Sequence, residues 1–194
     1  MMYRRLLVVS VVLAGLTLAA CRRESPPPPA PVEEAEEAGP DLDSLRAYED
    51  SVRAAEEAAR LAAERERAVA DARAILEQRV HFDFDESAIR SDTEQVLRQK
   101  LAILNNSPQV QLRLEGHTDE RGSVEYNQAL GSRRAQSVLE FFTQNGISAN
   151  RFQTTSYGEE RPLVNESNES AWAQNRRVEF VIISGGDQIN PPGS

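Results

Sequence analysis

The chain has little of what most catalytic sites are built from. Its 194 residues include one cysteine and two histidines, so an internal disulfide is excluded and no recognisable metal-binding motif is present. The sequence has no nucleophile elbow, phosphate-binding loop or dinucleotide-binding glycine motif. We therefore expect no enzymatic activity and no cofactor. A formal net charge of −9, without a basic stripe, argues against binding to nucleic acid.

The first segment is typical of an exported protein. Arg4 and Arg5 precede an apolar run over 6–20, which is shorter than the roughly 20 residues that a membrane-spanning helix needs. The only cysteine, Cys21, follows at once, so we expect a signal peptide over 1–20. The residues Leu-Ala-Ala-Cys at this point resemble the bacterial lipobox, which implies that Cys21 carries a lipid. An ordinary secretory cleavage nearby is the alternative.

Two segments separate this start from the rest of the chain. Residues 21–40 are rich in proline and glutamate, a composition that cannot build a core and predicts an extended tether. Residues 41–79 contain no glycine or proline and have a weak apolar seam, which predicts one long helix. A dimer through this seam and a single solvated spacer helix both fit the pattern. Together the two segments can span on the order of 100 Å.

Residues 80–183 are near the size of one ordinary domain. We expect strands, from the alternation of apolar and polar residues, over 80–84, 110–114, 152–157 and 178–183. We expect one helix from a capping box at 91–94 to just before Pro108, and another over 123–145. The order β-α-β-α-β-β predicts an α+β domain of two layers, in which helices cover one face of a mixed sheet. Residues 184–194 are expected to form a flexible tail.

The second helix carries an arginine on its apolar face. At about 100° per residue, Arg134 lies roughly 40° from Val138, inside an arc that also holds Leu130 and Phe142. Arg133 lies about 140° from Val138 and should be solvated. Because burying an unpaired charge is costly, Arg134 must have a partner. A structural salt bridge and one half of a ligand clamp both meet this requirement.

The loop before this helix belongs to a set of specific motifs. They are Gly-His-Thr-Asp-Glu-Arg-Gly at 116–122, Tyr-Asn at 126–127, Leu-Gly at 130–131, Arg-Arg-Ala at 133–135, Phe-Asp-Phe-Asp at 82–85 and Asn-Arg-Arg-Val at 175–178. On these motifs, residues 80–183 resemble the OmpA-like peptidoglycan-binding domain. With the lipobox and the acidic tether, the whole chain resembles the peptidoglycan-associated lipoproteins of the Tol–Pal system.

The resemblance implies non-covalent binding of peptidoglycan through the meso-diaminopimelate of its stem peptide. The free end of that residue carries an ammonium and a carboxylate on one carbon. By the family's pattern, Asp119 takes the ammonium and Arg134 takes the carboxylate. The planar fork of arginine suits a carboxylate in a way that lysine does not.

The resemblance also implies a set of neighbours for this clamp. Main-chain N–H groups around Phe84, Asp85 and Thr118 are expected to meet other carboxylates of the stem. Leu130 and Asn127 are expected to shape the pocket.

Other charged residues have simpler interpretations. Glu120 and Arg121 are expected to contact one another or water, a pairing that contributes little. For Arg176 and Arg177, contact with the glycan or stem and a solvated role both remain open. His117 lies beside acidic residues, but with so few histidines we expect no metal site.

For the whole chain, the resemblance implies an outer-membrane lipoprotein with its domain in the periplasm. Residue 22 is Arg, not the Asp that retains enterobacterial lipoproteins at the inner membrane. The protein would tether the outer membrane to the cell wall, serve envelope integrity and cell division, and exchange with the periplasmic β-propeller protein of the Tol system. The alternative is a wall-anchoring module of another envelope assembly, with the 41–79 helix as its protein-interaction element.

Overall fold

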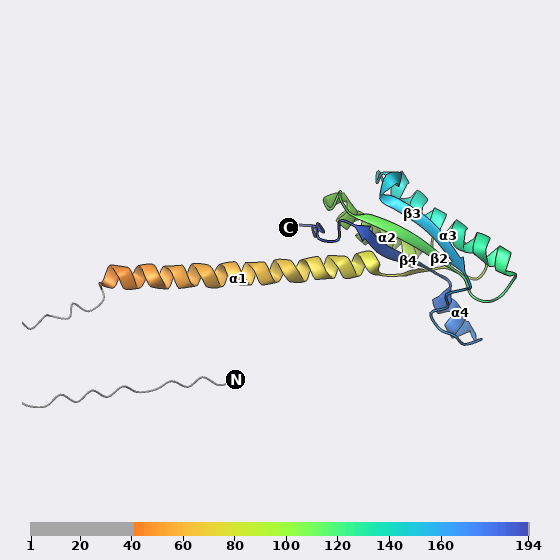
Figure 1. Ribbon diagram of the computed structural model, residues 1–194, viewed down its shortest axis with the longest axis horizontal. Helices are drawn as coiled ribbons and strands as arrows, with labels where there is room; N and C mark the ends of the chain where they lie inside the picture. The colour runs from red at the N-terminus through yellow and green to blue at the C-terminus, as the bar shows by residue number, and fades with distance from the viewer. Residues whose placement is uncertain (1–40, 194) are drawn as a thin grey trace, which may run out of the picture. The chain divides into compact units, whose positions relative to one another are not determined.

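The computed structural model describes residues 41–193 of the chain. The expected signal peptide over 1–20, the lipid acceptor Cys21 and the tether over 21–40 lie outside these residues. The elements follow in the order α1 (Leu42–Glu77), β1 (Val80–His81), α2 (Ser91–Asn106), β2 (Gln111–His117), α3 (Val124–Gln144), the 3-10 helix η1 (Ala149–Arg151), β3 (Phe152–Gly158), α4 (Glu169–Asn175) and β4 (Arg177–Ser184) (Figure 1). Within residues 41–193, none of the helices combines the length and the apolar character that a membrane span requires.

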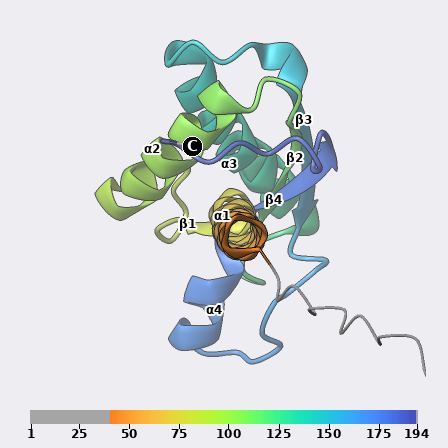
Figure 2. The ribbon, with the colours of Figure 1, turned by 90° about the vertical axis from the view of Figure 1, so that its left-hand side faces the viewer.

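The four strands form one mixed sheet in the order β1-β4-β2-β3. Strand β4 runs antiparallel to both β1 and β2, whereas β2 and β3 are parallel. Helices α2 and α3 lie on the same side of the sheet (Figure 2). The α+β class and the mixed sheet with helices on one face are therefore confirmed.

Helix α4 is an element that we did not predict, since the segment between the last two strands was interpreted as a polar loop. It begins with a side-chain cap, in which Asn168 accepts a hydrogen bond of 3.0 Å from the amide of Ala171. The helix has only seven residues, too few for an apolar periodicity to be visible in the sequence. It lies beside the end of the sheet where the β2–α3 loop leaves (Figure 1).

One predicted capping motif and one predicted boundary were wrong, although α2 begins at Ser91 and ends before Pro108 as expected. The capping box at 91–94 is not formed, because Arg90 is the N-cap and makes no capping bond, while Asp92 accepts from the amide of Thr93 at 2.8 Å. The first strand, expected over 80–84, ends at His81. The chain then turns through Asp85, whose φ of 59° lies in the left-handed region that aspartate tolerates better than most residues.

The core lies between the sheet and the two helices. Phe142 of α3 stacks on Phe152 at the start of β3, with ring centroids 5.1 Å apart. The core comprises Ala72, Leu76, Val80, Phe82, Leu97, Ile103, Leu104, Val110, Leu112, Leu114, Ala135, Val138, Phe142, Ile147, Phe152, Val178, Phe180 and Ile189. The alternation of the strands and the wheel of α3 thus place the expected residues inside.

The end of α1 is part of this core, although nearly all of the rest of the helix is exposed. Ala72 and Leu76 are buried, and the fully buried Lys100 of α2 holds the last turn in place. Its Nζ donates to the carbonyls of Ile75, Leu76 and Gln78 at 2.6 to 2.7 Å. A helix end has carbonyls without partners in the helix, and Lys100 satisfies them from the domain.

The residues expected to form a flexible tail over 184–194 are held against the domain as far as residue 193 is described. Ile189 is buried in the core. The amide of Asn190 donates to Ser107 Oγ at 2.9 Å, and that hydroxyl donates to the carbonyl of Asn190. The sequence signal for a loose tail was its glycine and proline content, which does not exclude an ordered loop.

Two glycines allow α3 to approach β2 unusually closely. A Cβ atom at Gly116 would lie 1.9 Å from the carbonyl oxygen of Gly131, and one at Gly131 would lie 2.4 Å from Ser156 Oγ. Both distances are too short for any side chain. The contact therefore fixes the distance between the end of β2 and the turn of α3 that precedes Arg134.

Replacing Lys100 by methionine should lower the free energy of unfolding by about 3 kcal/mol, because it leaves buried carbonyls without a donor. Urea unfolding measures this loss, and hydrogen exchange should show faster opening of the last turn of α1. Arg98→Met is the matched control, since Arg98 lies exposed on the same helix and pairs only with Glu94. It should change stability by less than about 0.5 kcal/mol, and equal losses in both variants would contradict the role given to Lys100.

Replacing Gly116 by alanine should cost about 3 kcal/mol, because backbone atoms of α3 and β2 cannot both keep their places. Thermal or urea unfolding tests this expectation. Gly186→Ala is the control, since a Cβ there would meet mainly the end of the flexible Arg73 side chain. A Gly116→Ala protein as stable as the wild type would show that the two elements separate easily.

Candidate functional site

The β2–α3 loop is held at both ends. At its start, the amide of Thr118 donates to the carbonyl of Gly158 at 2.9 Å. At its end, Ser123 caps α3 by accepting from the amide of Tyr126 at 3.2 Å. Between them, Asn127 Nδ2 donates to the carbonyl of Arg121 at 3.2 Å. These three hydrogen bonds therefore hold the loop in one conformation.

Asp119 is buried within this loop with 4 % of its surface exposed. Its Oδ2 accepts from Arg121 Nη2 at 2.7 Å and from Arg176 Nη1 at 3.2 Å, and its Oδ1 accepts from the amide of Arg121 at 3.2 Å. Burial by itself would raise the pKa of Asp119, but the hydrogen bonds from Arg121 and Arg176 outweigh it and hold the pKa below its usual value. The site therefore contains a stable carboxylate.

Arg134 has no exposed surface, as the helical wheel predicted. It is not held by a salt bridge: among the described residues no carboxylate lies within ion-pairing distance of it. Its Nε donates to the carbonyl of Glu86 at 2.8 Å, Nη1 to that of His117 at 2.8 Å and Nη2 to that of Asp83 at 3.0 Å. Burial lowers the pKa of Arg134 to about 10, so it stays charged at neutral pH.

Three of the five N–H groups of that guanidinium are used by these carbonyls. One N–H remains on each terminal nitrogen. The structural salt bridge considered from the sequence is therefore absent, while donors for an anion remain. A buried cation with spare donors and no carboxylate partner is suited to binding an anionic ligand.

Asp119 and Arg134 line the same small cavity, which has a volume of about 200 Å³. The residues around it are Phe84, Asp85, Thr118, Asp119, Arg121, Gly122, Tyr126, Asn127, Leu130 and Arg134. All seven ligand-binding residues expected from the sequence are in this set. The structure therefore brings together segments from β1–α2, β2–α3 and α3 that lie up to 50 positions apart.

The role expected of Thr118 needs a correction. We expected its main-chain N–H to be free for a ligand, but that group already donates to Gly158. Its hydroxyl is the available group, because Thr118 Oγ1 is buried and has no partner among the described residues. The amides of Phe84 and Asp85 have no acceptor among the described residues, so both remain candidates.

Arg121 is the main site residue that the sequence interpretation missed. It was expected to form a surface pair with Glu120, but its guanidinium lies between the rings of Phe84 and Trp172, at 3.9 and 4.2 Å from their centroids. Glu120 instead accepts from Trp172 Nε1 at 3.1 Å. Trp172 belongs to α4, and without that helix the sequence offered no signal for this stack.

Arg176 and Arg177 are also not solvated. They are buried, with 6 % and 3 % of their surfaces exposed. Arg176 reaches Asp119 and also donates to Glu169 at 2.9 Å. Arg177 donates to Glu179 at 2.7 Å on the other side of the sheet. Arg177 is the first residue of β4, whereas Arg176 precedes the strand as the C-cap of α4, and of the two only Arg176 contacts Asp119.

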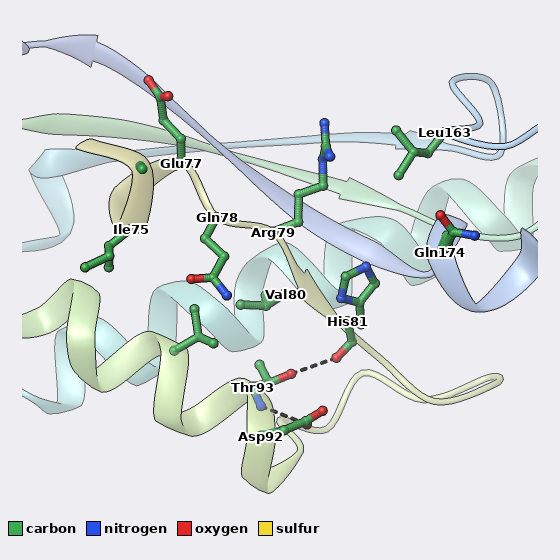
Figure 3. A pocket seen from close by; sticks show the side chains of 12 residues that line it. Ile75, Glu77, Gln78, Arg79, Val80, His81, Asp92, Thr93, Leu163 and Gln174 are labelled. Carbon is green, nitrogen blue, oxygen red and sulfur yellow. Dashed lines mark hydrogen bonds between the residues drawn. The ribbon is translucent and has the colours of Figure 1, made fainter. Parts of the chain in front are cut away.

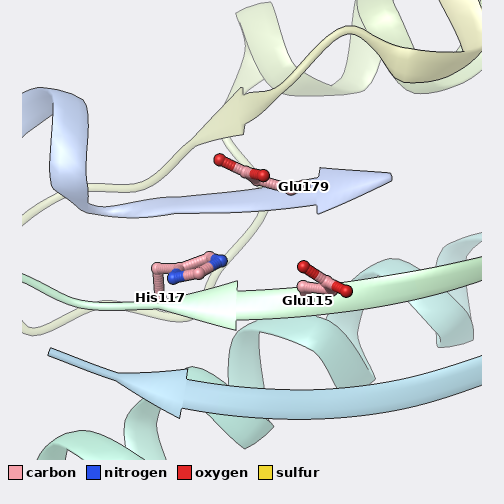
Figure 4. A group of neighbouring side chains, drawn as sticks. All are labelled: Glu115, His117 and Glu179. Atoms are coloured by element: carbon pink, nitrogen blue, oxygen red, sulfur yellow. The ribbon is translucent and has the colours of Figure 1, made fainter. Parts of the chain in front are cut away.

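A second group of titratable side chains lies on the sheet face away from α2 and α3. Glu115, His117 and Glu179 lie close together there, with one potential ligand atom from each within 4.8 Å of the others (Figure 4). Arg113 pairs with Glu115 at 2.6 Å, and Arg177 with Glu179.

Arg79 also pairs with Glu179, at 3.0 Å. Three guanidinium groups therefore surround the two carboxylates, and this excess of positive charge disfavours a divalent cation. The group fits an ion-pair network better than a metal centre.

A larger groove of about 840 Å³ lies between the end of α1, β1 and the start of α2 (Figure 3). Two of its polar side chains are already paired. Thr93 Oγ1 donates to the carbonyl of His81 at 2.8 Å, and Asp92 pairs with Arg90 at 2.9 Å. Its charged side chains do not converge on a common point (Figure 3). The smaller cavity is therefore the candidate site.

His117 should make stability depend on pH. Burial, with the positive charge of Arg177, lowers the pKa of His117 to about 4, whereas the unfolded chain titrates near 6.5. The unfolded state thus binds the extra proton first, and stability that is complete above about pH 6.5 is lost as the pH falls towards 4. The loss attributable to His117 should be on the order of 3 kcal/mol.

Urea unfolding of the wild type and of His117→Gln at pH 7 and pH 4.5 measures this loss of stability. The stability difference between the two proteins should shrink or reverse at the lower pH. His81→Gln serves as the comparison: burial also lowers the pKa of His81, but this side chain is only half-buried, so its difference should change less between the two pH values. A constant difference between wild type and His117→Gln at both pH values would contradict the buried neutral histidine.

Comparison with known proteins agrees with this site. The model of the OmpA family matches residues 81–176. Peptidoglycan-associated lipoproteins from Brucella melitensis biotype 1 and Pasteurella multocida are each 44 % identical, over 108 and 106 residues, which is 56 % and 53 % of this chain. The matches span 64 % of the Brucella protein and 71 % of the Pasteurella protein.

The fold has a counterpart among solved structures. The crystal structure of the peptidoglycan-associated lipoprotein from Burkholderia pseudomallei is 36 % identical, with a TM-score of 0.53. The match covers 54 % of this chain and 89 % of the Burkholderia chain. Together with the family motif and the fold, these matches show that the chain belongs to the OmpA family.

Proposed function

We propose that this protein binds peptidoglycan non-covalently, through the meso-diaminopimelate of the stem peptide, and so tethers the outer membrane to the cell wall. The observation that carries the proposal is the convergence of Asp119 and Arg134 on one small cavity. The names of the similar proteins, peptidoglycan-associated lipoproteins, support the choice of ligand.

The chemistry of the cavity matches the free end of diaminopimelate. Asp119 is an ionised acceptor for the ammonium, and Arg134 keeps one N–H on each terminal nitrogen for the carboxylate. The cavity of about 200 Å³ is smaller than the roughly 300–1,000 Å³ of sites that enclose drug-sized ligands. It can therefore take the end of a side chain, while the glycan stays outside.

Other groups at the cavity can complete the recognition. The hydroxyl of Thr118 is buried without a partner, so a hydrogen bond to the ligand would remove the cost of leaving it unsatisfied. The amides of Phe84 and Asp85 are the proposed donors to a second carboxylate of the stem. Asn127 holds the loop and Leu130 supplies an apolar wall, so neither needs to contact charge.

The rest of the chain suits a protein that works at a distance from its anchor. We propose that Cys21 carries the lipid in the outer membrane and that the domain lies in the periplasm. Helix α1 has 36 residues, which corresponds to about 54 Å. By family resemblance, the Tol-system β-propeller protein is the proposed partner, and the proposed role is binding without catalysis.

Asp119→Asn is the sharpest test of this function. It keeps the shape of the side chain but removes the charge that would pair with the ammonium, so we expect binding to weaken by about 30-fold or more. Co-sedimentation of the purified protein with diaminopimelate-containing sacculi measures the affinity. Arg134 is a poorer choice for mutation, because its three carbonyl contacts also support the fold.

Glu120→Gln is the matched control, since Glu120 is the adjacent carboxylate but does not line the cavity. It should bind like the wild type. Thermal unfolding of both variants checks that they are folded, and sacculi with lysine in place of diaminopimelate test the role of the ligand carboxylate. Wild-type binding that Asp119→Asn retains in full would overturn the assignment of the site.

A further inference from the structure

Asp119, the carboxylate proposed to bind the ligand's ammonium, is already paired with an arginine. Arg121 reaches both oxygens of Asp119, with Nε 3.3 Å from Oδ1 and Nη2 2.7 Å from Oδ2. Arg121 also lines the cavity. An incoming ammonium therefore meets a carboxylate whose positive partner stands where the ligand must approach.

Two arginines pair with Asp119, and they differ in how firmly they are held. Arg176 is buried, donates to the carbonyl of Phe82 at 3.2 Å and leaves 7 % of its side chain exposed. The Arg121 side chain is 30 % exposed and is held on its two faces only by the rings of Phe84 and Trp172. Partly exposed ion pairs are worth little compared with buried ones, so Arg121 is the partner that can leave.

A second carboxylate can remain the partner of Arg121 when it leaves Asp119. Glu169, in the first turn of α4, already lies 3.6 Å from Arg121 Nη1, accepts from Arg176 Nη2 at 2.9 Å through its other oxygen and is 65 % exposed. The guanidinium can thus turn away from Asp119 without losing a counter-charge. Its ring contacts allow this movement, because stacking on an aromatic face constrains the plane of the guanidinium more than its direction.

We propose that Arg121 is a resident counter-ion of Asp119 which the ligand's ammonium displaces towards Glu169, and that this exchange makes Arg121 a specificity-determining residue. The inference rests on the proposed function. A ligand that carries an ammonium replaces the charge that leaves Asp119. A ligand that carries only carboxylates cannot replace this charge. Arg121 then stays beside Asp119 and still partly fills the cavity.

Trp172 provides a direct readout, since it is the only tryptophan in the chain and does not line the cavity. The protein is titrated with a soluble muropeptide whose stem ends in diaminopimelate, and calorimetry gives the affinity independently. Rotation of the Arg121 guanidinium over the indole should change the tryptophan fluorescence in step with binding. A muropeptide acetylated on the free amino group should give neither the change nor tight binding.

Arg121→Ala separates this role from a purely structural one. Without the competing guanidinium, the muropeptide should bind about fivefold more tightly, since a partly exposed ion pair of about 1 kcal/mol no longer has to be broken. The fluorescence change on binding should disappear. Arg161→Ala is the matched control, because Arg161 also lies over an aromatic ring, 3.7 Å from the centroid of Tyr157, but does not line the cavity.

The possible outcomes distinguish the two proposals. If the muropeptide binds the wild type but fluorescence stays constant, or if Arg121→Ala shows the same change, the exchange is wrong and the proposed function stands. Weaker binding by Arg121→Ala would show that Arg121 contacts the ligand and does not compete with it, which also overturns the exchange. If no protein binds the muropeptide, the proposed function itself fails.

Discussion

The burial of one guanidinium organises the end of the domain at which the cavity lies. Arg134 is fully enclosed, so its charge must be met by acceptors from the protein. It finds them in the carbonyls of Asp83 and Glu86, in the β1–α2 loop, and of His117, the last residue of β2. The same contacts that satisfy the arginine thereby fix this loop and the start of the β2–α3 loop at one end of the sheet. The cavity is the space that remains between the segments so assembled.

This arrangement depends on the close approach of α3 to β2. The carbonyl of His117 and the side chain of Arg134 can meet only if the helix lies against the strand at this level, and Gly116 and Gly131 permit that distance. Glycine and arginine thus act together. The glycines bring the helix close, and the arginine then connects it to the loops. Their adjacency in the family motif has a packing reason as well as a chemical one.

The sequence could predict the position of Arg134 but not its partners. The helical wheel depends only on the period of the helix, so it placed this residue inside correctly. Its three acceptors are main-chain carbonyls, which every residue has and no side-chain pattern reveals. For the same reason the sequence left the choice between a salt bridge and a clamp open, and only the structure shows that no carboxylate within residues 41–193 pairs with it.

The site residues that the sequence analysis did not predict share one cause, which is that helix α4 was not predicted. This helix is too short to show a period, and its neighbours are polar, so the segment was read as a loop. Trp172 and Glu169 were therefore not connected with the cavity, and Arg121 was left as a surface residue. Resemblance supplied seven of the ten lining residues, since they lie in the motifs. The stack over Asp119 depends on a contact between segments about 50 positions apart, which one sequence does not reveal.

The charge balance of the site is compatible with the proposed ligand, although Asp119 is already paired. Asp119 is surrounded by Arg121, Arg134 and Arg176, while Asp85 at the cavity and Glu169 at its rim supply two further negative charges, so three positive and three negative charges balance without a ligand. A zwitterionic ligand adds no net charge to this balance, because its carboxylate offsets its own ammonium. A simple anion would add an unbalanced negative charge and leave Asp119 paired as before. The distribution of charge therefore favours a ligand that carries both signs on one carbon, and this preference arises from the protein before any ligand contact is counted.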